Sequence, residues 1–363
     1  MNKNNYALIM AGGIGSRFWP VSRTEFPKQF IDFFGIGKTL IQSTYDRFLR
    51  ICPPENIFIV TNELYTSIIK EQLPNIQDNQ ILAEPIMRNT APCVAYGAMK
   101  IAEINPDATI VVAPSDHTIA NLDKFIAAIE QSLIAAANND CLITLGIQPS
   151  RPDTGYGYIQ YTENSLPTDP EVYKVKLFTE KPNIDLATSF IQSGDFLWNA
   201  GIFIWSAKSI NKAFEKHLPE MYDIFKSGLS IYNTPDEAAF ISNAYQQCTN
   251  ISIDFGIMEK ANNVYVLPAE FGWSDLGTWA SIYEMAEKDY VGNVVLPADK
   301  VMMFNSSNCM VNVPENKLVV LNGLHDFIVV EANDILMICP RSEEQSVKQI
   351  VADIKSKFGT KYT

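Results

Sequence analysis

The sequence predicts an α/β fold in which helices alternate with the strands of a doubly wound, mostly parallel sheet. Three observations favour this class. The short apolar runs at residues 6–10 and 57–61 are continuous rather than alternating, which is typical of strands covered on both faces. Segments with apolar side chains at helical spacing separate these runs. A glycine-rich loop follows the first run directly, at the kind of strand end where open α/β sheets bind their ligands.

The alternation of strands and helices continues to about residue 146. The expected helices lie at residues 40–49, 63–72, 90–103 and 122–138. The expected strands lie at residues 6–10, 57–61, 81–82, 109–113 and 141–146. Because each helix lies between two strands, this segment is predicted to form successive βαβ units of one sheet.

The pattern loosens after residue 150. We expect strands of a substrate-facing insertion at residues 154–159 and 173–180, followed by a loop that enters a buried strand at residues 196–205. A mainly helical segment is expected at residues 209–261, a further strand at residues 264–268, and a polar-aromatic turn into a helix at residues 271–279.

The composition changes again near Gly292. Residues 294–340 contain short β-rich pieces separated by turn residues such as Asn322-Gly323, and a helix at residues 346–357 follows. We therefore predict two domains, a catalytic domain at residues 1–290 and a small β-rich module with a terminal helix at residues 291–363.

Composition excludes several classes of protein. With 363 residues, 47% hydrophobic and 19% charged, the chain is typical of an ordinary globular protein. A net charge of −13 argues against nucleic acid or anionic membrane as a partner. No apolar run approaches the roughly 20 residues of a membrane span. The six cysteines form no CxxC pair, which favours reduced core residues over a zinc site or disulfides, so we expect a cytoplasmic protein.

The loop after the first strand is the strongest local signal. It carries three glycines within residues 12–15, and Arg17 and Lys28 follow it. Glycines let the backbone approach a ligand and offer its N–H groups, while the basic side chains add positive charge. A Walker loop would need Gly-Lys-Ser/Thr, and a dinucleotide fingerprint would need glycine in place of Phe18. The pattern therefore indicates a phosphate site of another kind, with a purely geometric turn as the alternative.

Here the sequence resembles a known family. The loop at residues 11–20, with Pro27-Lys28-Gln29-Phe30 after it, resembles the signature of sugar-1-phosphate nucleotidylyltransferases. Its Phe-Trp-Pro ending and its Lys-Gln-Phe are similar to the mannose-1-phosphate guanylyltransferase branch. Seven further motifs match that branch in order along the chain: Glu84-Pro85 and residues 88–92, 114–117, 155–159, 180–182, 198–203 and 272–277.

The resemblance implies an activity and an architecture. The sugar phosphate of α-D-mannose 1-phosphate would attack the α-phosphorus of GTP in line with Mg²⁺ assistance, giving GDP-mannose and pyrophosphate. The catalytic domain would have the Rossmann-like fold of nucleotide-diphospho-sugar transferases. The C-terminal module would resemble a fragment of left-handed β-helix, which often takes part in dimer contacts in the family, so we expect a homodimer. Longer relatives carry a cupin-type isomerase domain beyond this point, so we expect a monofunctional enzyme.

The resemblance also assigns the phosphate chemistry. Asp116 and Asp275 are expected to hold Mg²⁺, an ion that usually takes one or two carboxylates together with substrate phosphates. Taken alone, either aspartate could instead cap a helix. Arg17 is expected to grip the triphosphate, and Lys28 to act near the α-phosphate. His117 alone would be a general-base candidate, but directly after Asp116 we interpret it as a supporting residue.

The sugar phosphate has its own candidate residues. Lys181 is expected to clamp the phosphate, and Glu180 and Asn199 to hydrogen-bond the sugar hydroxyls, with an ordinary surface Glu-Lys pair as the alternative. Trp198 and Trp273 flank these motifs and could either stack on the sugar or fill the core. Two further residues complete this group: Tyr156 and Gly157.

Base choice is assigned to Glu84. Its carboxylate could accept the N1–H and amino hydrogens of guanine, which uracil and thymine do not offer. Asn89 and Thr90 could help to bind the nucleotide or could simply cap the helix that follows. The remaining expected nucleotide contacts are Ala11, Gly12, Gly13, Gly15, Ser16 and Ser115.

Two rival functions stay open from the sequence. One is the same chemistry with dTTP or UTP and glucose 1-phosphate. The other is a non-catalytic protein that binds a nucleotide sugar and regulates a partner. Such regulators tend to lose a metal carboxylate or the phosphate-binding arginine, whereas Arg17, Asp116 and Asp275 are all present here.

Overall fold

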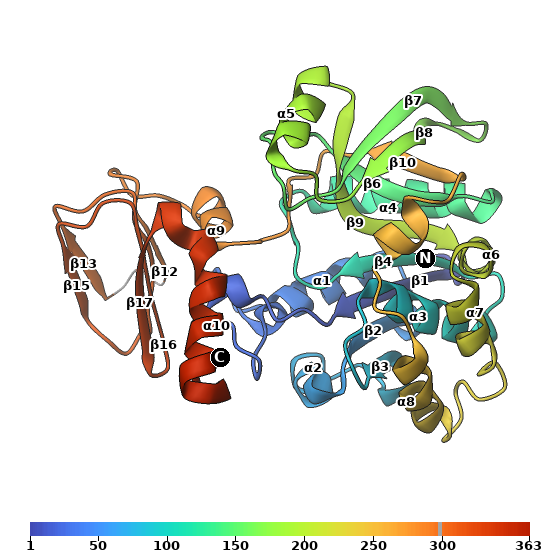
Figure 1. Ribbon diagram of the computed structural model, residues 1–363, viewed down its shortest axis with the longest axis horizontal. Helices are drawn as coiled ribbons and strands as arrows, with labels where there is room; N and C mark the ends of the chain where they lie inside the picture. Colours follow the sequence, from blue (N-terminus) through green and yellow to red (C-terminus); the bar gives the residue numbers. More distant parts are fainter. Residues whose placement is uncertain (297–299) are drawn as a thin grey trace. The chain divides into compact units, whose positions relative to one another are not determined.

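The computed structural model describes residues 1–296 and 300–363 (Figure 1). The chain divides into two compact units. Unit 1 contains residues 1–12, 44–115 and 119–273, and unit 2 contains residues 13–43, 116–118 and 274–363. Unit 2 thus adds two earlier segments to the C-terminal module, and the domain boundary between residues 290 and 291 stays a prediction. Residues 297–299, part of the expected β-rich stretch, lie outside the described residues.

Unit 1 is built on a mixed sheet of nine strands. The strands are β1 (Asn5–Ala11), β2 (Ile57–Asn62), β3 (Ile81–Glu84), β4 (Thr109–Pro114), β6 (Leu142–Ile147), β7 (Tyr158–Leu166), β8 (Asp169–Thr179), β9 (Phe196–Ser206) and β10 (Val264–Pro268). Their order is β3-β2-β1-β4-β9-β6-β10-β8-β7 (Figure 1). Strands β3, β2, β1 and β4 are parallel to one another, whereas β9 runs antiparallel to both β4 and β6.

Helices cover both faces of this sheet. On one face, four helices share a core cluster with alternate strand residues such as Leu8 and Val112. These helices are α3 (Thr90–Ile104), α6 (Ala207–His217), α7 (Pro219–Lys226) and α8 (Glu237–Gln247). On the other face, α4 (Leu122–Asn138) packs against β4, β6 and β9, and its buried Phe125 and Ile129 lie outside that cluster. The predicted α/β class with helices on both faces is therefore confirmed.

The remaining helices and short strands are brief. The α-helices are α1 (Leu40–Phe48), α2 (Thr66–Gln72) and α5 (Ile184–Ser193), and a π-helix spans Asp254–Met258. Single 3-10 turns occur at η1 (Ser16–Phe18), η2 (Lys28–Phe30), η3 (Pro54–Asn56), η4 (Glu63–Tyr65) and η5 (Asp78–Gln80). Two-residue strands β5 (Thr118–Ile119) and β11 (Trp273–Ser274) lie where the chain passes from one unit to the other.

The C-terminal part of unit 2 is a coil of short strands. These are β12 (Val294–Leu296), β13 (Val301–Phe304), β14 (Met310–Asn312), β15 (Val319–Asn322), β16 (Phe327–Ala332) and β17 (Ile335–Pro340). The last strand, β17, pairs antiparallel with β16. Strands β12, β14 and β16 form one parallel set and β13 and β15 another, so successive strands alternate between two sheets, as in a β-helix. Helices α9 (Trp279–Met285) and α10 (Val347–Phe358) share a buried cluster with β14 and β16. A final 3-10 turn, η8, spans Gly359–Tyr362.

Most predicted elements are confirmed, and two boundaries differ for a clear reason. Residues 154–157 belong to a bent loop, and strand β7 begins only at Tyr158. Residues 196–205 were expected as a loop that enters a buried strand, but β9 begins directly at Phe196, because residues 196–198 pair with β7. All six cysteines are free and buried, as predicted. In the described part of the chain, none of the helices is both long and apolar enough to span a membrane.

Candidate active site

Unit 2 contains a pocket of about 340 Å³ that gathers charged residues from distant segments, and we call it the charged pocket. Four parts of the chain line it: the glycine loop with η2, the residues after β4, the turn after β11, and α10. The lining residues are Gly15, Ser16, Arg17, Lys28, Asp116, His117, Asp275, Leu276, Gly277 and Lys348.

The loop geometry requires glycine at position 15. Gly15 has φ of 70°, the left-handed region that favours glycine. A Cβ at this position would lie 2.4 Å from Cβ of Lys28, closer than any real contact. Gly13 differs, because a Cβ there would meet no atom of the described residues within 4 Å. Gly15 therefore allows Lys28 to approach the loop, whereas Gly13 leaves open space beside it.

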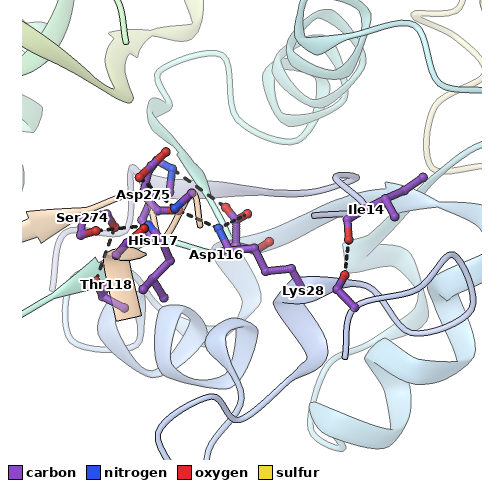
Figure 2. A network of polar contacts seen from close by, with 12 residues as sticks. Ile14, Lys28, Asp116, His117, Thr118, Ser274 and Asp275 are labelled. Carbon is purple, nitrogen blue, oxygen red and sulfur yellow. Dashed lines mark hydrogen bonds and ion pairs between the residues drawn. The ribbon is translucent and has the colours of Figure 1, made fainter. Parts of the chain in front are cut away.

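Lys28 lies at the centre of the polar network in this pocket (Figure 2). Its side chain is buried, and its Nζ lies 2.9 Å from Oδ2 of Asp116. The same Nζ donates a hydrogen bond of 2.6 Å to the main-chain oxygen of Asp275. Lys28 thus ties together two segments that are far apart in the sequence and holds a permanent positive charge in a fixed position.

Asp116 is held in its ionised form. Burial raises the pKa of its carboxyl, but the charges of Lys28 and His117 and the hydrogen bond from Lys28 lower it by more, so the pKa lies below its ordinary value. His117 contributes through an Nε2 that lies 3.9 Å from Oδ1 of Asp116. The side chain keeps 27% of its surface exposed, so this carboxylate faces the pocket.

Asp275 lies on a tight turn with unusual backbone. Its Oδ1 accepts a hydrogen bond of 3.0 Å from the N–H of Gly277. Between them Leu276 has φ of 45°, which is rare for a residue with a branched side chain. The Leu276 side chain is fully buried in the cluster that contains Phe18 and Trp279, and this packing holds the turn in place. The aspartate is thus presented by a turn that the core of unit 2 fixes.

Two basic side chains of the charged pocket are exposed. Arg17 lies in η1 and Lys348 lies in the first turn of α10. Neither has an ion-pair partner among residues 1–296 and 300–363. The sequence predicted Arg17 but not Lys348, because no local pattern marks one lysine of an amphipathic helix as a site residue.

Glu84 lies in unit 1, at the end of β3, and is buried. Tyr245, a residue that the sequence did not predict, donates a hydrogen bond of 2.8 Å to Oε1 of Glu84. Burial raises the pKa of Glu84 to about 7, and the bond from Tyr245 offsets part of the rise. A Cβ on Gly12 would lie 3.6 Å from Oε2 of Glu84, so the first glycine of the loop is next to this carboxyl.

Asn89 and Thr90 have local structural partners. Asn89 is the N-cap of α3, where its side chain accepts a hydrogen bond of 2.9 Å from the N–H of Thr90. Thr90 Oγ1 accepts a bond of 2.9 Å from the N–H of Ile253. The capping role that the sequence left open is thus present, and nucleotide contact by these residues stays a prediction.

A second group of polar residues in unit 1 surrounds Asn199. Its Nδ2 donates a hydrogen bond of 3.0 Å to Oδ1 of Asp254, and its Oδ1 accepts one of 2.8 Å from Oγ1 of Thr144. Burial and the charge of Glu180 raise the pKa of Asp254 to about 7. We call Glu180, Asn199 and Asp254 the amide–carboxyl group. Asp254 opens the π-helix, a rare element that often occurs at functional sites.

Glu180 and Lys181 form an ion pair with unequal exposure. Lys181 Nζ lies 2.5 Å from Oε1 of Glu180, with 60% of the lysine side chain but only 9% of the glutamate side chain exposed. Gly157 allows this packing, because a Cβ there would lie 2.5 Å from Oε2 of Glu180. This differs from an ordinary surface pair, since the carboxylate is enclosed and only the ammonium group faces solvent.

The aromatic residues of this region pack on one another. The Tyr156 ring contacts the rings of Trp198 and Trp273 edge to face, at centroid distances of 4.9 and 5.2 Å. Trp198 is buried in a small cluster with Tyr158 and Phe196, so for Trp198 the core-filling alternative is the one observed.

Ala11 and Ser115 occupy backbone positions at strand ends. Ala11 ends β1, and its carbonyl accepts a hydrogen bond of 2.8 Å from Oγ1 of Thr61. Ser115 follows β4, and its N–H donates to the carbonyl of Met10 at 3.0 Å. Their contact with a nucleotide stays a prediction.

Of the residues that the sequence did not predict, Asp254 left the clearest signal. It is a lone aspartate within the apolar segment 251–258. Tyr245 and Lys348 left none, because each acquires its neighbours only through the fold.

The chain matches two family models. The model described as nucleotidyl transferase matches residues 6–291, and the model described as MannoseP isomerase/GMP-like beta-helix domain matches residues 299–354. The first of these covers well over half of the chain.

Several named proteins are similar over nearly the whole chain. A putative mannose-1-phosphate guanylyltransferase of Vibrio cholerae is 35% identical over 98% of this chain and 75% of its own length. Mannose-1-phosphate guanylyltransferase 2 of Escherichia coli O157:H7 is 34% identical over 98% and 74%. Alginate biosynthesis protein AlgA of Pseudomonas fluorescens is 36% identical over 96% and 72%. The crystal structure named mannose-1-phosphate geranyltransferase, from Thermus thermophilus, has a TM-score of 0.85 and 29% identity, covering 97% of this chain and 99% of that one.

Proposed function

The chain belongs to the nucleotidyl transferase family, in the group of the mannose-1-phosphate guanylyltransferases, and we propose that it transfers GMP from GTP to α-D-mannose 1-phosphate. The products are GDP-mannose and pyrophosphate. One observation of the structure carries the proposal: Arg17, Lys28, Asp116 and Asp275 line one pocket. Two anionic substrates that must react with each other need this combination of fixed cations and metal-binding carboxylates.

The basic residues of the charged pocket bind the phosphates of the substrates. Lys28 acts at the α-phosphate, where its position is set before substrate arrives by Asp116 and by the main chain of Asp275. Arg17 grips the triphosphate and stabilises the charge that develops on the leaving pyrophosphate. The attacking sugar phosphate is already ionised, so positioning replaces a general base.

The carboxylates of the same pocket fit a magnesium ion. Asp116 and Asp275 would hold it, and the lowered pKa of Asp116 keeps one ligand ionised at neutral pH. Within the described residues no cluster of three or more His, Cys, Asp or Glu side chains could hold a metal, which suits an ion that takes its other ligands from substrate phosphates and water. When bound, the ion neutralises phosphate charge and orients the phosphates.

Glu84 selects the base. An ionised carboxylate accepts both the N1–H and the amino hydrogens of guanine, and the hydroxyl of Tyr245 holds it in place from one side. The nucleotide backbone is cradled by the loop and strand-end residues, a role supported by the open space at Gly13. These residues are Ala11, Gly12, Gly13, Gly15, Ser16, Asn89, Thr90 and Ser115.

The amide–carboxyl group recognises the sugar. Glu180 and Asn199 hydrogen-bond the mannose hydroxyls, Asp254 orients the amide of Asn199, and the exposed ammonium of Lys181 holds the sugar phosphate. Tyr156 and Gly157 shape the wall of this group, which their contacts with Trp198 and Glu180 support.

The protein acts in the cytoplasm as a homodimer, without nucleic acid or membrane as a partner. Six free, buried cysteines are compatible with a reducing compartment. The net charge of −13 disfavours anionic polymers. Exposed apolar side chains on β13 and β15, among them Met302, Phe304 and Val320, support burial against a second copy.

A substrate panel tests the proposal. GTP, ATP, UTP and dTTP are each combined with mannose 1-phosphate and with glucose 1-phosphate in the presence of Mg²⁺, and pyrophosphate release is measured. We expect the highest kcat/KM for GTP with mannose 1-phosphate. A preference for UTP or dTTP would refute the guanylyl assignment, and GDP-mannose binding without turnover of any pair would refute the enzyme.

A further inference from the structure

Helix α10 brings a lysine into the charged pocket. The helix packs against η1 of the glycine loop, and its first residue, Val347, is fully buried in the cluster that contains Phe18 and Trp19. The next residue is Lys348, which lines the pocket together with Arg17 and Lys28. Because Val347 anchors the first turn of α10 in the core of unit 2, the backbone of Lys348 is held beside the pocket.

A second contact fixes the same segment. The indole Nε1 of Trp19, at the end of the signature loop, donates a hydrogen bond of 2.7 Å to the carbonyl oxygen of Tyr362. The C-terminal segment is therefore tied to the loop at both ends, by Val347 at the start of α10 and by Tyr362 after it. This double attachment holds the helix that carries Lys348 against the loop that carries Arg17.

The charges of the pocket leave a role for Lys348. The charge of Lys28 is largely compensated, since it forms an ion pair with Asp116. Besides His117, which faces Asp116, the pocket contains Arg17 and Lys348, and neither of these two forms an ion pair with any residue that the structure describes. A triphosphate and its pyrophosphate product carry several negative charges, more than one arginine neutralises.

We propose that Lys348 is a phosphate-binding residue of the nucleotidyl transfer site and contacts the two phosphates that leave as pyrophosphate. It shares the pocket with Gly15, Ser16 and Arg17, the residues expected to hold the triphosphate, which favours these phosphates over the sugar phosphate. The C-terminal helix thereby completes the site that the N-terminal loop begins. This inference rests on the proposed function of the charged pocket.

The test compares Lys348→Met with wild type, with Lys348→Arg as the charge-preserving variant. Lys355→Met is the matched control, because Lys355 is exposed on the same helix and does not line the pocket. We expect Lys348→Met to raise the KM for GTP in the forward reaction, and for pyrophosphate in the reverse reaction, about tenfold. The KM for mannose 1-phosphate should stay within about twofold of wild type. Lys348→Arg should recover most of the loss, and Lys355→Met should match wild type.

Binding of inorganic tripolyphosphate, measured by calorimetry with Mg²⁺, separates this inference from the proposed function. If wild type turns over no nucleotide with either hexose phosphate, the proposed function fails, while weaker tripolyphosphate binding by Lys348→Met still supports the lysine. Unchanged KM values together with unchanged tripolyphosphate binding would overturn the inference. Thermal unfolding checks that the variants are folded, and Lys348→Gln replaces the methionine variant if that one is not.

Discussion

The pKa of a carboxyl is shifted in opposite directions in the charged pocket of unit 2 and at the buried carboxyls of unit 1. The carboxyl of Asp116 has a lowered pKa, because Lys28 and His117 outweigh the effect of burial. The carboxyls of Glu84 and Asp254 have pKa values raised to about 7, because burial outweighs the hydrogen bonds from Tyr245 and Asn199 and, at Asp254, the charge of Glu180 opposes that of Lys181. The neighbouring side chains, rather than burial itself, therefore decide whether the pKa of a carboxyl is lowered or raised.

In the proposed function, this difference separates two tasks of one reaction. A carboxylate that stays ionised suits a cation and phosphates, where charge must be balanced throughout the reaction. Carboxyls that titrate near neutral pH suit the N–H and O–H groups of a base and a sugar, which are uncharged. We therefore expect changes in the charged pocket to affect turnover, and changes in unit 1 to affect substrate preference and its pH dependence.

The largest effect should come from Asp275→Asn. The amide keeps the size of the side chain but removes a charge needed for the metal, so kcat should fall about 1,000-fold. The fold should survive, because Lys28 bonds to the main-chain oxygen of residue 275 rather than to its carboxylate. Pyrophosphate release at saturating substrate measures the loss, with Asp353→Asn, an exposed aspartate of α10, as the control. A kcat within twofold of wild type would remove Asp275 from the metal site.

Local sequence patterns predicted strands and helices well where each face of the element is either buried or exposed along its whole length. The continuous apolar runs of β1 and β2 and the periodic pattern of α4 identified these elements, because both faces of the strands and one face of the helix are buried. The start of β7 and the first residues of β9 could not be predicted, because their pairing with each other depends on a contact across the chain.

The candidate site likewise contains residues that the sequence predicted and residues that it did not. Arg17, Lys28, Asp116 and Asp275 were each found from motifs, and the structure brings all four into one pocket. Their neighbours were not found. Tyr245 meets Glu84 from a helix with no signature, and Lys348 reaches the charged pocket only because α10 packs on the loop. A motif identifies a residue by its own chain segment, whereas these partners are defined by the fold.

Glu84→Gln should change base preference by an intermediate amount. Glutamine presents an N–H₂ group in place of one acceptor, so it cannot accept both guanine donors, and the ratio of kcat/KM for GTP over ATP should fall about tenfold. In wild type, a pKa of about 7 means that the carboxyl is increasingly protonated below pH 7, so the KM for GTP should rise between pH 8 and pH 6. The variant should lack this rise.

The KM for ATP over the same pH range corrects for titration of the triphosphate, because both nucleotides carry the same phosphates. Tyr245→Phe serves as a second variant, since it removes the hydrogen bond to Glu84 but keeps the carboxylate. An unaltered GTP preference in Glu84→Gln would show that the base is read elsewhere.

The smallest effect should come from Asp254→Asn, which keeps an oxygen that can accept from Asn199 but removes the titrating carboxyl. The KM for mannose 1-phosphate should change about threefold at pH 8, where wild-type Asp254 is mostly ionised, and little at pH 6, where it is mostly protonated.

The same substitution should change how stability depends on pH. The pKa of Asp254 is raised in the folded protein, so its contribution to stability is complete below the unfolded-state value and is lost as the pH rises through about 7. The wild-type unfolding midpoint should therefore fall between pH 5 and pH 8, and the variant should show a shallower fall. Asp223→Asn, an exposed aspartate of α7, is the control and should keep the wild-type slope. An Asp254→Asn variant that keeps both the wild-type pH slope and the wild-type KM would mean that Asp254 does not titrate between pH 5 and pH 8 and does not position Asn199 for mannose 1-phosphate.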